Sequence, residues 1–322
     1  MQDKKRTWGK FILEVVFLVA LFTLVQYFIT TGILNRYYQI NLTLMGINVI
    51  LAVSLNLING FTGQLSLGHA GFMAIGAFAS VIMTTMLEYP FIIGIIIAML
   101  AAALAGFIIG VPTLRLKGDY LAIATLGFGE IIRVVLQNID YTGGPAGISG
   151  ITKMTTWPVL FTAVVITIVV IVNMINSSYG RAIISVREDE VAAEIMGINT
   201  TKYKVLAFVV GAAFAGLGGA LYAHYFYIIK PETFNFLKSF DILVMVVLGG
   251  LGSTTGAVIA AMFITVLNAF LQEYAAVRMI IYALILIIVM IYRPQGLLGN
   301  KELTRKSFDR IWGGKHVSST NK

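Results

Sequence analysis

The sequence predicts an all-α polytopic membrane protein with about ten transmembrane helices, two of its segments being apolar runs broken by glycines. Of the 322 residues, 58% are hydrophobic and only 12% are charged, and the mean hydropathy is +0.88. Ordinary soluble domains are about 45 to 50% apolar and about 25% charged. Apolar runs also recur at close to the length of roughly 20 residues that crosses about 30 Å of hydrocarbon. Both observations indicate a protein that crosses a membrane many times.

The predicted spans follow one another along most of the chain. The clearest is Phe91 to Val111, because it contains no charged residue. The others cover residues 11–30, 41–59, 70–87, 121–138, 158–175, 205–227, 240–248, 256–271 and 277–292. The short run 240–248 and the run 256–271 are alternatively one broken helix. The predicted organisation is a cytoplasmic segment 1–10, a transmembrane domain 11–292 with a cytoplasmic loop at about 177–204, and a basic cytoplasmic tail 293–322.

Lysine and arginine are concentrated in loops that ten spans place on one side of the membrane. That side carries Lys4, Lys5, Arg6, Lys10, Arg115, Lys117, Arg181, Arg187, Lys202, Lys204 and the basic tail from Arg293 to Lys315. The opposite loops carry Arg36, Lys153, Lys230 and Lys238. Short basic loops remain cytoplasmic, so both termini are predicted on the cytoplasmic face of a bacterial-type plasma (inner) membrane.

Charge and cysteine content exclude several other classes of protein. The net charge of +8 is spread over short loops and a tail, which favours anionic lipid headgroups over a nucleic-acid partner. The chain has no cysteine, so disulfides and thiolate metal sites are excluded. No metal site is predicted.

The first glycine-broken segment is "GFTGQLSLGHAGF", Gly60 to Phe72. Irregular backbone survives at membrane depth only where protein or a water-filled cavity covers it, so this segment is expected to face inward. Its candidate substrate-path residues are Thr62, Gly63, Gln64, Ser66 and His69. The alternative is a tight loop whose polar side chains are satisfied internally.

The second segment is "GGLGSTTGAVIAA", Gly249 to Ala261, with Ser253 and Thr254 as its candidate path residues. Paired interruptions in two halves of a chain indicate a transporter's central binding site and an internal repeat. Between the two segments, Gly211, Ala215 and Gly219 recur every four residues, a spacing that predicts close packing of helix backbones.

A charged segment from Arg181 to Phe208 interrupts the membrane pattern. Helical spacing over 188–196 places Val191, Ile195 and Ile198 along one apolar edge, and Gly197 is suited to end the helix. A short helix with an apolar edge between two spans is suited to docking on another protein. The alternative is a solvated loop helix with no partner.

Five stretches, in order between residues 41 and 299, resemble one family: "GQLSLGHAGFMAIGAFAS", "TGGPAGISG", "VREDEVAAEIMGIN", "VVLGGLGSTTGAVIAA" and "RPQGLLG". They are similar to the permeases of branched-chain amino acid ABC importers. The loop from Thr142 to Gly147, with Arg293, Pro294 and Gly296, favours the M-type over the H-type subunit.

The resemblance implies an ABC importer permease fold that forms half of a translocation path. It implies four partners: a second permease, two cytoplasmic ATPases and an extracytoplasmic substrate-binding protein. The resemblance also implies an ATPase-coupling helix whose residues are Arg187, Glu188, Asp189, Glu190, Ala192, Ala193, Glu194 and Gly197. Ala192, Ala193 and Gly197 keep the spacing of the general ABC pattern, but Val191 stands where that pattern has Glu.

No Gly-Lys-Ser/Thr phosphate loop is found. The chain is therefore expected to be a transport subunit and not an enzyme, with no cofactor of its own and with ATP bound by its partners.

Other functions stay open at this point. Urea or short-amide importers have similar permeases, and one methylene in an apolar pocket discriminates by only about 1 to 3 kcal/mol. An ion-coupled secondary transporter needs acidic residues deep in the bundle, and the candidates Glu14, Glu130 and Asp241 are few and near span ends. Glu130 and Arg133 are expected to form a structural ion pair, and His224 to lie at the membrane interface. Ser66 and His69 lack the third member of a hydrolase triad.

Overall fold

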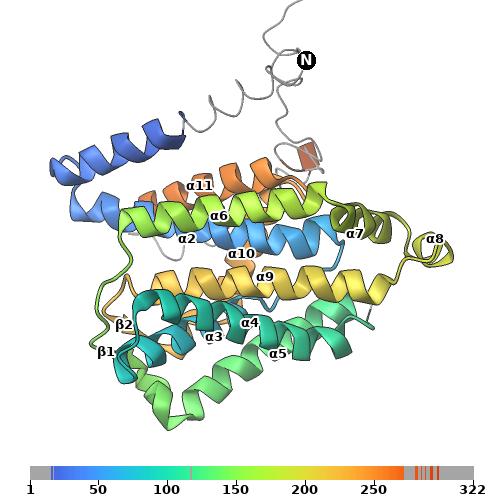
Figure 1. Ribbon diagram of the computed structural model, residues 1–322, viewed down its shortest axis with the longest axis horizontal. Helices are drawn as coiled ribbons and strands as arrows, with labels where there is room; N and C mark the ends of the chain where they lie inside the picture. Colours follow the sequence, from blue (N-terminus) through green and yellow to red (C-terminus); the bar gives the residue numbers. More distant parts are fainter. Residues whose placement is uncertain are drawn as a thin grey trace, which may run out of the picture.

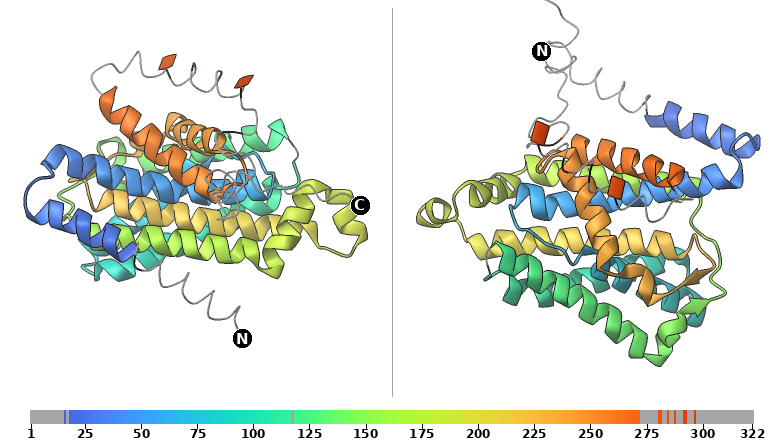
Figure 2. Two further views of the ribbon diagram at one scale, coloured as in Figure 1. Left: turned by 90° about the horizontal axis from the view of Figure 1, so that it is seen from above. Right: turned by 180° about the vertical axis from the view of Figure 1, so that it is seen from behind.

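The computed structural model describes residues 16, 18–116 and 118–271, together with 280, 281, 284, 287, 291, 292 and 296. This part of the chain is a bundle of helices, most of which run side by side along one direction (Figures 1 and 2). The predicted segment 1–10, with Glu14, and nearly all of the predicted last span and tail lie outside the described residues.

The labelled helices are α2 (Arg36–Asn56), α3 (His69–Val81), α4 (Phe91–Thr113), α5 (Asp119–Asn138), α6 (Trp157–Asn176), α7 (Ser178–Glu188), α8 (Glu190–Ile195), α9 (Thr200–Ala223), α10 (Phe236–Gly249) and α11 (Thr254–Phe270). An apolar helix, Leu18–Thr30, precedes them. The π-helical turns η1 (Leu57–Phe61) and η2 (Ile82–Met86) extend α2 and α3. The 3-10 turns are η3 (Asp140–Thr142), η4 (Gly144–Ala146) and η5 (Pro231–Phe234). Strand β1 (Ile148–Ser149) pairs antiparallel with β2 (Ile228–Ile229).

Within the part of the chain that the structure describes, five helical stretches are long and apolar enough to cross a membrane: Arg36–Phe61, His69–Met86, Phe91–Thr113, Trp157–Asn176 and Thr200–Ala223. The predicted mostly helical, multi-span fold is thereby confirmed. The exact number of ten spans stays a prediction.

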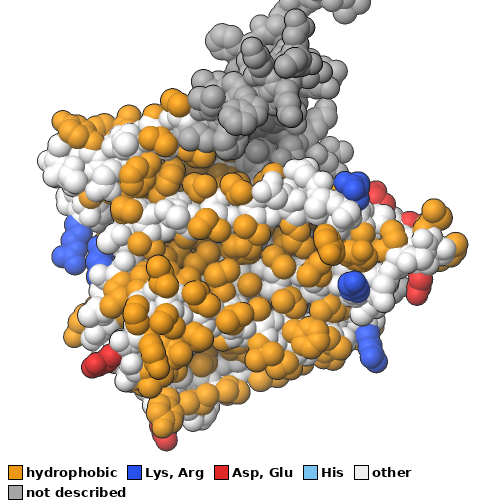
Figure 3. Space-filling view, in the orientation of Figure 1, with side chains coloured by type: hydrophobic (Ala, Val, Ile, Leu, Met, Phe, Trp, Pro, Cys, Tyr) orange, Lys and Arg blue, Asp and Glu red, His pale blue; other side chains and the backbone are white. Residues whose placement is uncertain are grey.

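Charged and apolar side chains separate along the bundle. In Figure 3 hydrophobic side chains cover the middle of the face, and charged side chains gather at its two ends. The short helix α8 projects from one end, and β1 and β2 lie at the other (Figure 1). Lys153 and Lys230 follow the two strands, whereas Arg187 and Lys204 flank α8. This arrangement agrees with the predicted separation of the loops into two sides.

Lys238 does not belong to the loops of the strand end, where the sequence had placed it. It lies within α10, and its Nζ donates to Asn48 Oδ1 of α2 at 3.3 Å. The sequence pattern misplaced it because α10 begins earlier than the apolar run does.

Helix α9 lies in the centre of the bundle and packs most extensively on α3 and α4. Its small residues allow close backbone contact on several sides. A Cβ added at Gly211 would lie 3.0 Å from Ser54 O of α2, one at Gly216 2.6 Å from Ala98 O of α4, and one at Gly219 2.0 Å from Met73 O of α3. The predicted close packing of this helix is confirmed.

Helices α10 and α11 are two separate helices joined by a turn. Gly250 and Gly252 in this turn have φ of +110° and +85°, values that favour glycine. Helix α10 has 14 residues, which at about 1.5 Å per residue is shorter than the roughly 30 Å hydrocarbon layer. It also crosses the long helices at a steep angle (Figure 2).

Candidate functional site at the junction of two broken segments

The two glycine-broken segments contact each other directly. Asn56 Oδ1 accepts from the backbone N–H of Gly252 at 2.9 Å, and Asn56 Nδ2 donates to Ser253 O at 2.9 Å. A Cβ added at Gly60 would lie 2.3 Å from Gly252 N, so only glycine allows this approach. We call Gly60, Gly63 and Gly252 the glycine junction.

A cavity of about 220 Å³ lies beside the junction. Its walls include Thr62, Gly63 and Gln64 from the first broken segment and Arg187, Glu190 and Lys204 from the α7–α9 region. The structure therefore brings three predicted path residues next to two of the predicted coupling residues, Arg187 and Glu190. This proximity was not predictable from either motif alone.

Three path residues carry buried polar atoms without hydrogen-bond partners. They are both amide atoms of Gln64, Ser66 Oγ and His69 Nδ1. Gln64 is 5% exposed, and Ser66 and His69 are fully buried. His69 Nε2 does have a partner, Ser54 Oγ, at 2.9 Å. Since the large majority of buried polar atoms in proteins are paired, these unpaired atoms are available to a polar solute. We call Gln64, Ser66 and His69, which lie close together in the sequence, the unpartnered cluster, and of the three Gln64 lines the cavity.

The backbone around these residues is held by side chains from neighbouring elements. Asn59 Oδ1 accepts from Ser66 N at 3.1 Å, and its Nδ2 donates to Ser66 O at 3.2 Å. Thr125 Oγ1 accepts from Leu67 N, and Ser239 Oγ accepts from Ala70 N, both at 3.0 Å. The segment thus faces inward, as its composition predicted.

Sequence reasoning missed Asn56, which bonds to the second segment, and the three residues that hold the first segment: Asn59, Thr125 and Ser239. The available signal was an amide or hydroxyl inside an otherwise apolar run. Such side chains at membrane depth generally bond to neighbouring helices or to freed backbone groups.

Ser253 and Thr254 take a different position from the other path residues. Ser253 Oγ accepts from Gly256 N at 3.1 Å, which makes it the N-cap of α11. Its carbonyl is held by Asn56 at the junction. Ser253 therefore fixes the start of α11, and the unpartnered cluster is formed by the first segment.

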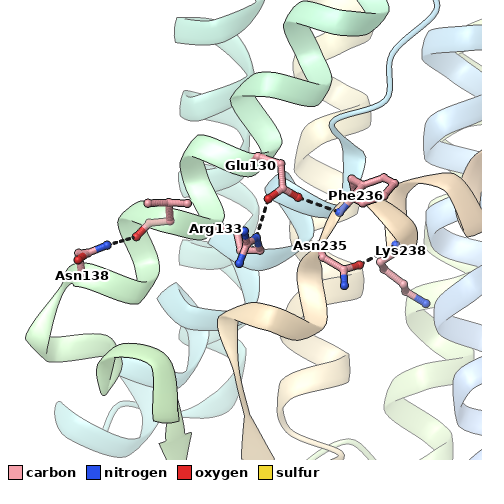
Figure 4. A network of polar contacts seen from close by, with 7 residues as sticks. Glu130, Arg133, Asn138, Asn235, Phe236 and Lys238 are labelled. Carbon is pink, nitrogen blue, oxygen red and sulfur yellow. Dashed lines mark hydrogen bonds and ion pairs between the residues drawn. The ribbon is translucent and has the colours of Figure 1, made fainter.

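Glu130 and Arg133 form the expected ion pair, with Nε and Oε2 2.7 Å apart (Figure 4). Glu130 Oε1 also accepts from Phe236 N at 2.9 Å. The carboxylate thus lies at the first turn of α10, where the helix dipole favours negative charge. Asn235 completes this end as N-cap by accepting from Lys238 N at 3.2 Å.

His224 is the C-cap of α9, and its level relative to the membrane interface stays a prediction. Its side chain is fully buried, with Nε2 2.7 Å from Thr84 Oγ1 and its ring 4.5 Å from that of Phe91, centroid to centroid. Nδ1 lies 2.9 Å from Ala220 O and 3.3 Å from Ser80 Oγ. The neighbouring tyrosines had indicated an interface, but these polar partners from α3, η2 and α9 make burial of the imidazole favourable.

Helix α8 is built by local signals. Asp189 Oδ1 accepts from Val191 N and Ala192 N, both at 3.0 Å, and Gly197 follows the helix with φ of +83°. Glu190 Oε1 and Lys204 Nζ, 2.6 Å apart, connect α8 to α9. Val191, Ile195 and Met196 are 63%, 81% and 81% exposed. The structure has a helix at the predicted place, outside the bundle (Figure 1). Of the predicted apolar edge, Val191 and Ile195 are exposed, whereas Ile198 is half-buried and Met196, the C-cap, is exposed instead.

A family model described as the permease component of branched-chain amino acid transport systems matches residues 37–291. The chain belongs to this permease family. It is therefore a multi-pass membrane protein that serves as the permease component of a transport system, and it is not an enzyme. Within the described residues, no group of three or more His, Cys, Asp or Glu is placed to hold a metal ion.

Curated relatives include both kinds of permease in the family. The chain is 35% identical to the high-affinity branched-chain amino acid permease LivM of Escherichia coli K12, over 90% of this chain and 76% of the relative. It is 24% identical to a probable LivM of Methanocaldococcus jannaschii, over 80% and 92% of the two chains. It is also 33% identical to LivH of Salmonella typhimurium, over 40% and 42%. No solved structure matches the chain.

Proposed function

We propose that this chain is the M-type permease of an ABC importer for leucine, isoleucine and valine, and that it forms half of the translocation path. The similarity to LivM over most of both chains supports the M type, and the partial similarity to LivH supports a second permease as partner. Two cytoplasmic ATPases and an extracytoplasmic binding protein complete the proposed importer. We propose that the α8 end of the bundle faces the cytoplasm and, from the distribution of lysine and arginine along the sequence, that both termini lie on the cytoplasmic side of the membrane.

The observation that carries this proposal is α8. A capped helix that exposes Val191, Ile195 and Met196 in water is unfavourable unless another protein covers it, because burying apolar area stabilises by about 25 cal/mol per Å². Its place outside the membrane-spanning bundle fits contact with a soluble subunit. ATP-driven approach of two ATPases would then displace α8 and rock the bundle between two openings.

The unpartnered cluster is the proposed contact for the polar end of the amino acid. Gln64, Ser66 and His69 offer donors and acceptors to a zwitterion. Phe72 and Met73, buried on the first turns of α3, offer apolar surface to its side chain. An ion-coupled carrier is less well supported, because Glu130 is already engaged by Arg133 and by the start of α10.

The variant Ser66→Ala tests whether Ser66 contacts the substrate or only belongs to a structural loop. Removing a buried hydroxyl that has no partner is expected to leave the thermal stability unchanged or raised, by up to about 1 kcal/mol, while the transport rate falls. The matched control is Thr125→Val, which leaves Leu67 N without its acceptor and should lower stability. The measurements are thermal unfolding in detergent and leucine uptake by the reconstituted importer. Unchanged uptake by Ser66→Ala would assign the residue to the loop alone.

Ile195→Ser with Met196→Ser is expected to release the ATPases. Loss of two side chains that are each 81% exposed should leave the fold intact, because surface substitutions usually change stability by less than about 0.5 kcal/mol. The measurement is co-purification of the ATPases with the tagged permease in mild detergent. The control is Tyr141→Ser, 73% exposed in the 3-10 turn η3 near the strands. Full recovery of the ATPases with the double variant would show that α8 is not the docking helix.

The same preparation tests the substrate. Reconstituted importer with its binding protein is supplied with labelled leucine, valine, urea or acetamide. ATP-dependent uptake of leucine and valine alone supports the proposal, whereas uptake of urea or acetamide would reassign the substrate class. Uptake without ATP would indicate a secondary transporter.

A further inference from the structure

Arg187 lies at the glycine junction and not on the exposed edge of α8. Its Nη1 donates to Gly60 O at 3.1 Å. A Cβ added at Gly252 would lie 2.9 Å from the same Nη1, and one added at Gly63 would lie 2.8 Å from Arg187 Cγ. One side chain from α7 therefore touches the backbone of all three junction glycines, which come from two segments far apart in the sequence.

The other side of the guanidinium is held by Glu188. Arg187 Nε donates to Glu188 Oε1 at 3.1 Å, and Nη2 forms an ion pair with the same oxygen. Because the five N–H donors of arginine are fixed in one plane, this pair sets the direction in which Nη1 points. Glu188 itself is 65% exposed and is the last residue of α7. Arg187 thus joins the approach to α8 with the interior of the bundle.

Helix α8 is linked so closely to the end of α7 that a displacement of α8 also moves Arg187. It begins two residues after Glu188, its N-cap is Asp189, and its first residue Glu190 is paired with Lys204 of α9. A displacement of α8 by a docked subunit is therefore carried into the ends of α7 and α9. Arg187, at the end of α7, is the contact that reaches the junction.

We infer that Arg187 is the positioning residue through which α8 sets the relative position of the two broken segments. The junction is where η1 ends and where α10 turns into α11, so a shift of Arg187 changes how these two parts of the bundle meet. The glycines are required there, since a side chain at Gly63 or Gly252 would meet Arg187 itself, and one at Gly60 would meet Asn56 and the backbone of Gly252. Because α8 receives the ATPases only under the proposed function, this role rests on that function.

The test compares four variants of the complete importer reconstituted in liposomes with its binding protein. Arg187→Gln removes the ion pair and shortens the reach, Arg187→Lys keeps the charge and one donor, and Glu188→Gln weakens only the orientation of the arginine. Arg181→Gln is the matched control, because Arg181 is exposed on the same helix and, among the described residues, its side chain bonds to the nearby Asn176 O at 3.4 Å. ATP hydrolysis, leucine uptake and ATPase co-purification are measured on each preparation.

Arg187→Gln is expected to keep its ATPases and to lower the leucine taken up per ATP hydrolysed by about ten-fold, within the range of coupling between linked sites. Arg187→Lys and Glu188→Gln should give intermediate ratios, and Arg181→Gln the unmodified ratio. If Arg187 had a purely structural role, its variants would lose assembly and ATP hydrolysis together, and the leucine taken up per ATP hydrolysed would stay unchanged. If Arg187→Gln does not assemble, the ratios of Arg187→Lys and Glu188→Gln decide.

Normal ratios in all Arg187 and Glu188 variants would overturn the inference. Failure of the proposed function has a different signature, because the α8 double variant would then keep its ATPases and its ATP-driven uptake. Loss of ATPases from the α8 double variant together with a normal ratio in Arg187→Gln would leave the proposed function in place and remove Arg187 from it.

Discussion

Gly219→Ala is expected to prevent the bundle from folding. The added Cβ would lie 2.0 Å from Met73 O and 2.9 Å from Ala77 N, both of them backbone atoms of α3. Neither can move aside as a side chain does, so α3 and α9 must separate. Overpacking commonly costs about 1 to 3 kcal/mol, and more where the clash is with backbone. The expected result is loss of the monodisperse peak of the tagged protein in size-exclusion chromatography.

The control for this prediction is Gly127→Ala, also within a helix. A Cβ at Gly127 meets nothing within 4 Å, so alanine should be neutral or stabilise the helix by up to about 1 kcal/mol. Gly219→Ala with the same chromatographic profile and thermal midpoint as Gly127→Ala would show that α3 and α9 are not packed as closely as the structure indicates.

Asn56→Ala is expected to abolish transport by disconnecting the two broken segments. The fully buried Asn56 side chain is the partner of Gly252 N and of Ser253 O. Its removal leaves a buried donor and a buried acceptor unsatisfied, at about 1 to 3 kcal/mol each. The start of α11 and the turn before it would lose their fixed position relative to η1. Leucine uptake and the thermal midpoint of the purified importer measure the two consequences.

Asn138→Ala is the matched control for Asn56→Ala. Asn138 is exposed at the end of α5, and its Nδ2 donates only to Val134 O of the same helix at 2.7 Å. Its removal should leave uptake within about two-fold and stability within about 0.5 kcal/mol of the unmodified protein. Equal behaviour of the two alanine variants would mean that Asn56 does not connect the segments.

The parts of the fold that were predicted well from the sequence are those with signals within a few neighbouring residues. Helix α8 was predictable because a capping Asp189, an apolar edge and a terminating Gly197 all lie within a few residues. The small residues of α9 were predictable for the same reason, since their spacing matches the helix period. The inward position of the first broken segment followed from the cost of free backbone in lipid.

Contacts between distant segments were not predictable in the same way. The sequence indicated that Gly60 and Gly252 belong to comparable segments, but no local pattern says that their backbones touch. Both side-chain hydrogen bonds of Asn56 described above lead to residues 252 and 253, so its role is invisible along its own helix. The burial of His224 was not predictable for a related reason, because its partners Ser80 and Thr84, on α3 and η2, lie far away in the sequence.

Residues 63–68, which connect η1 to α3, are not part of any helix or strand. Extended backbone advances by up to about 3.3 Å per residue, whereas an α-helix advances by 1.5 Å. Each residue that coils onto the start of α3, or uncoils from it, therefore changes the length of this connection by about 2 Å. Asn59 and Thr125 hold Ser66 and Leu67 in place and thereby fix the length of the connection between η1 and α3.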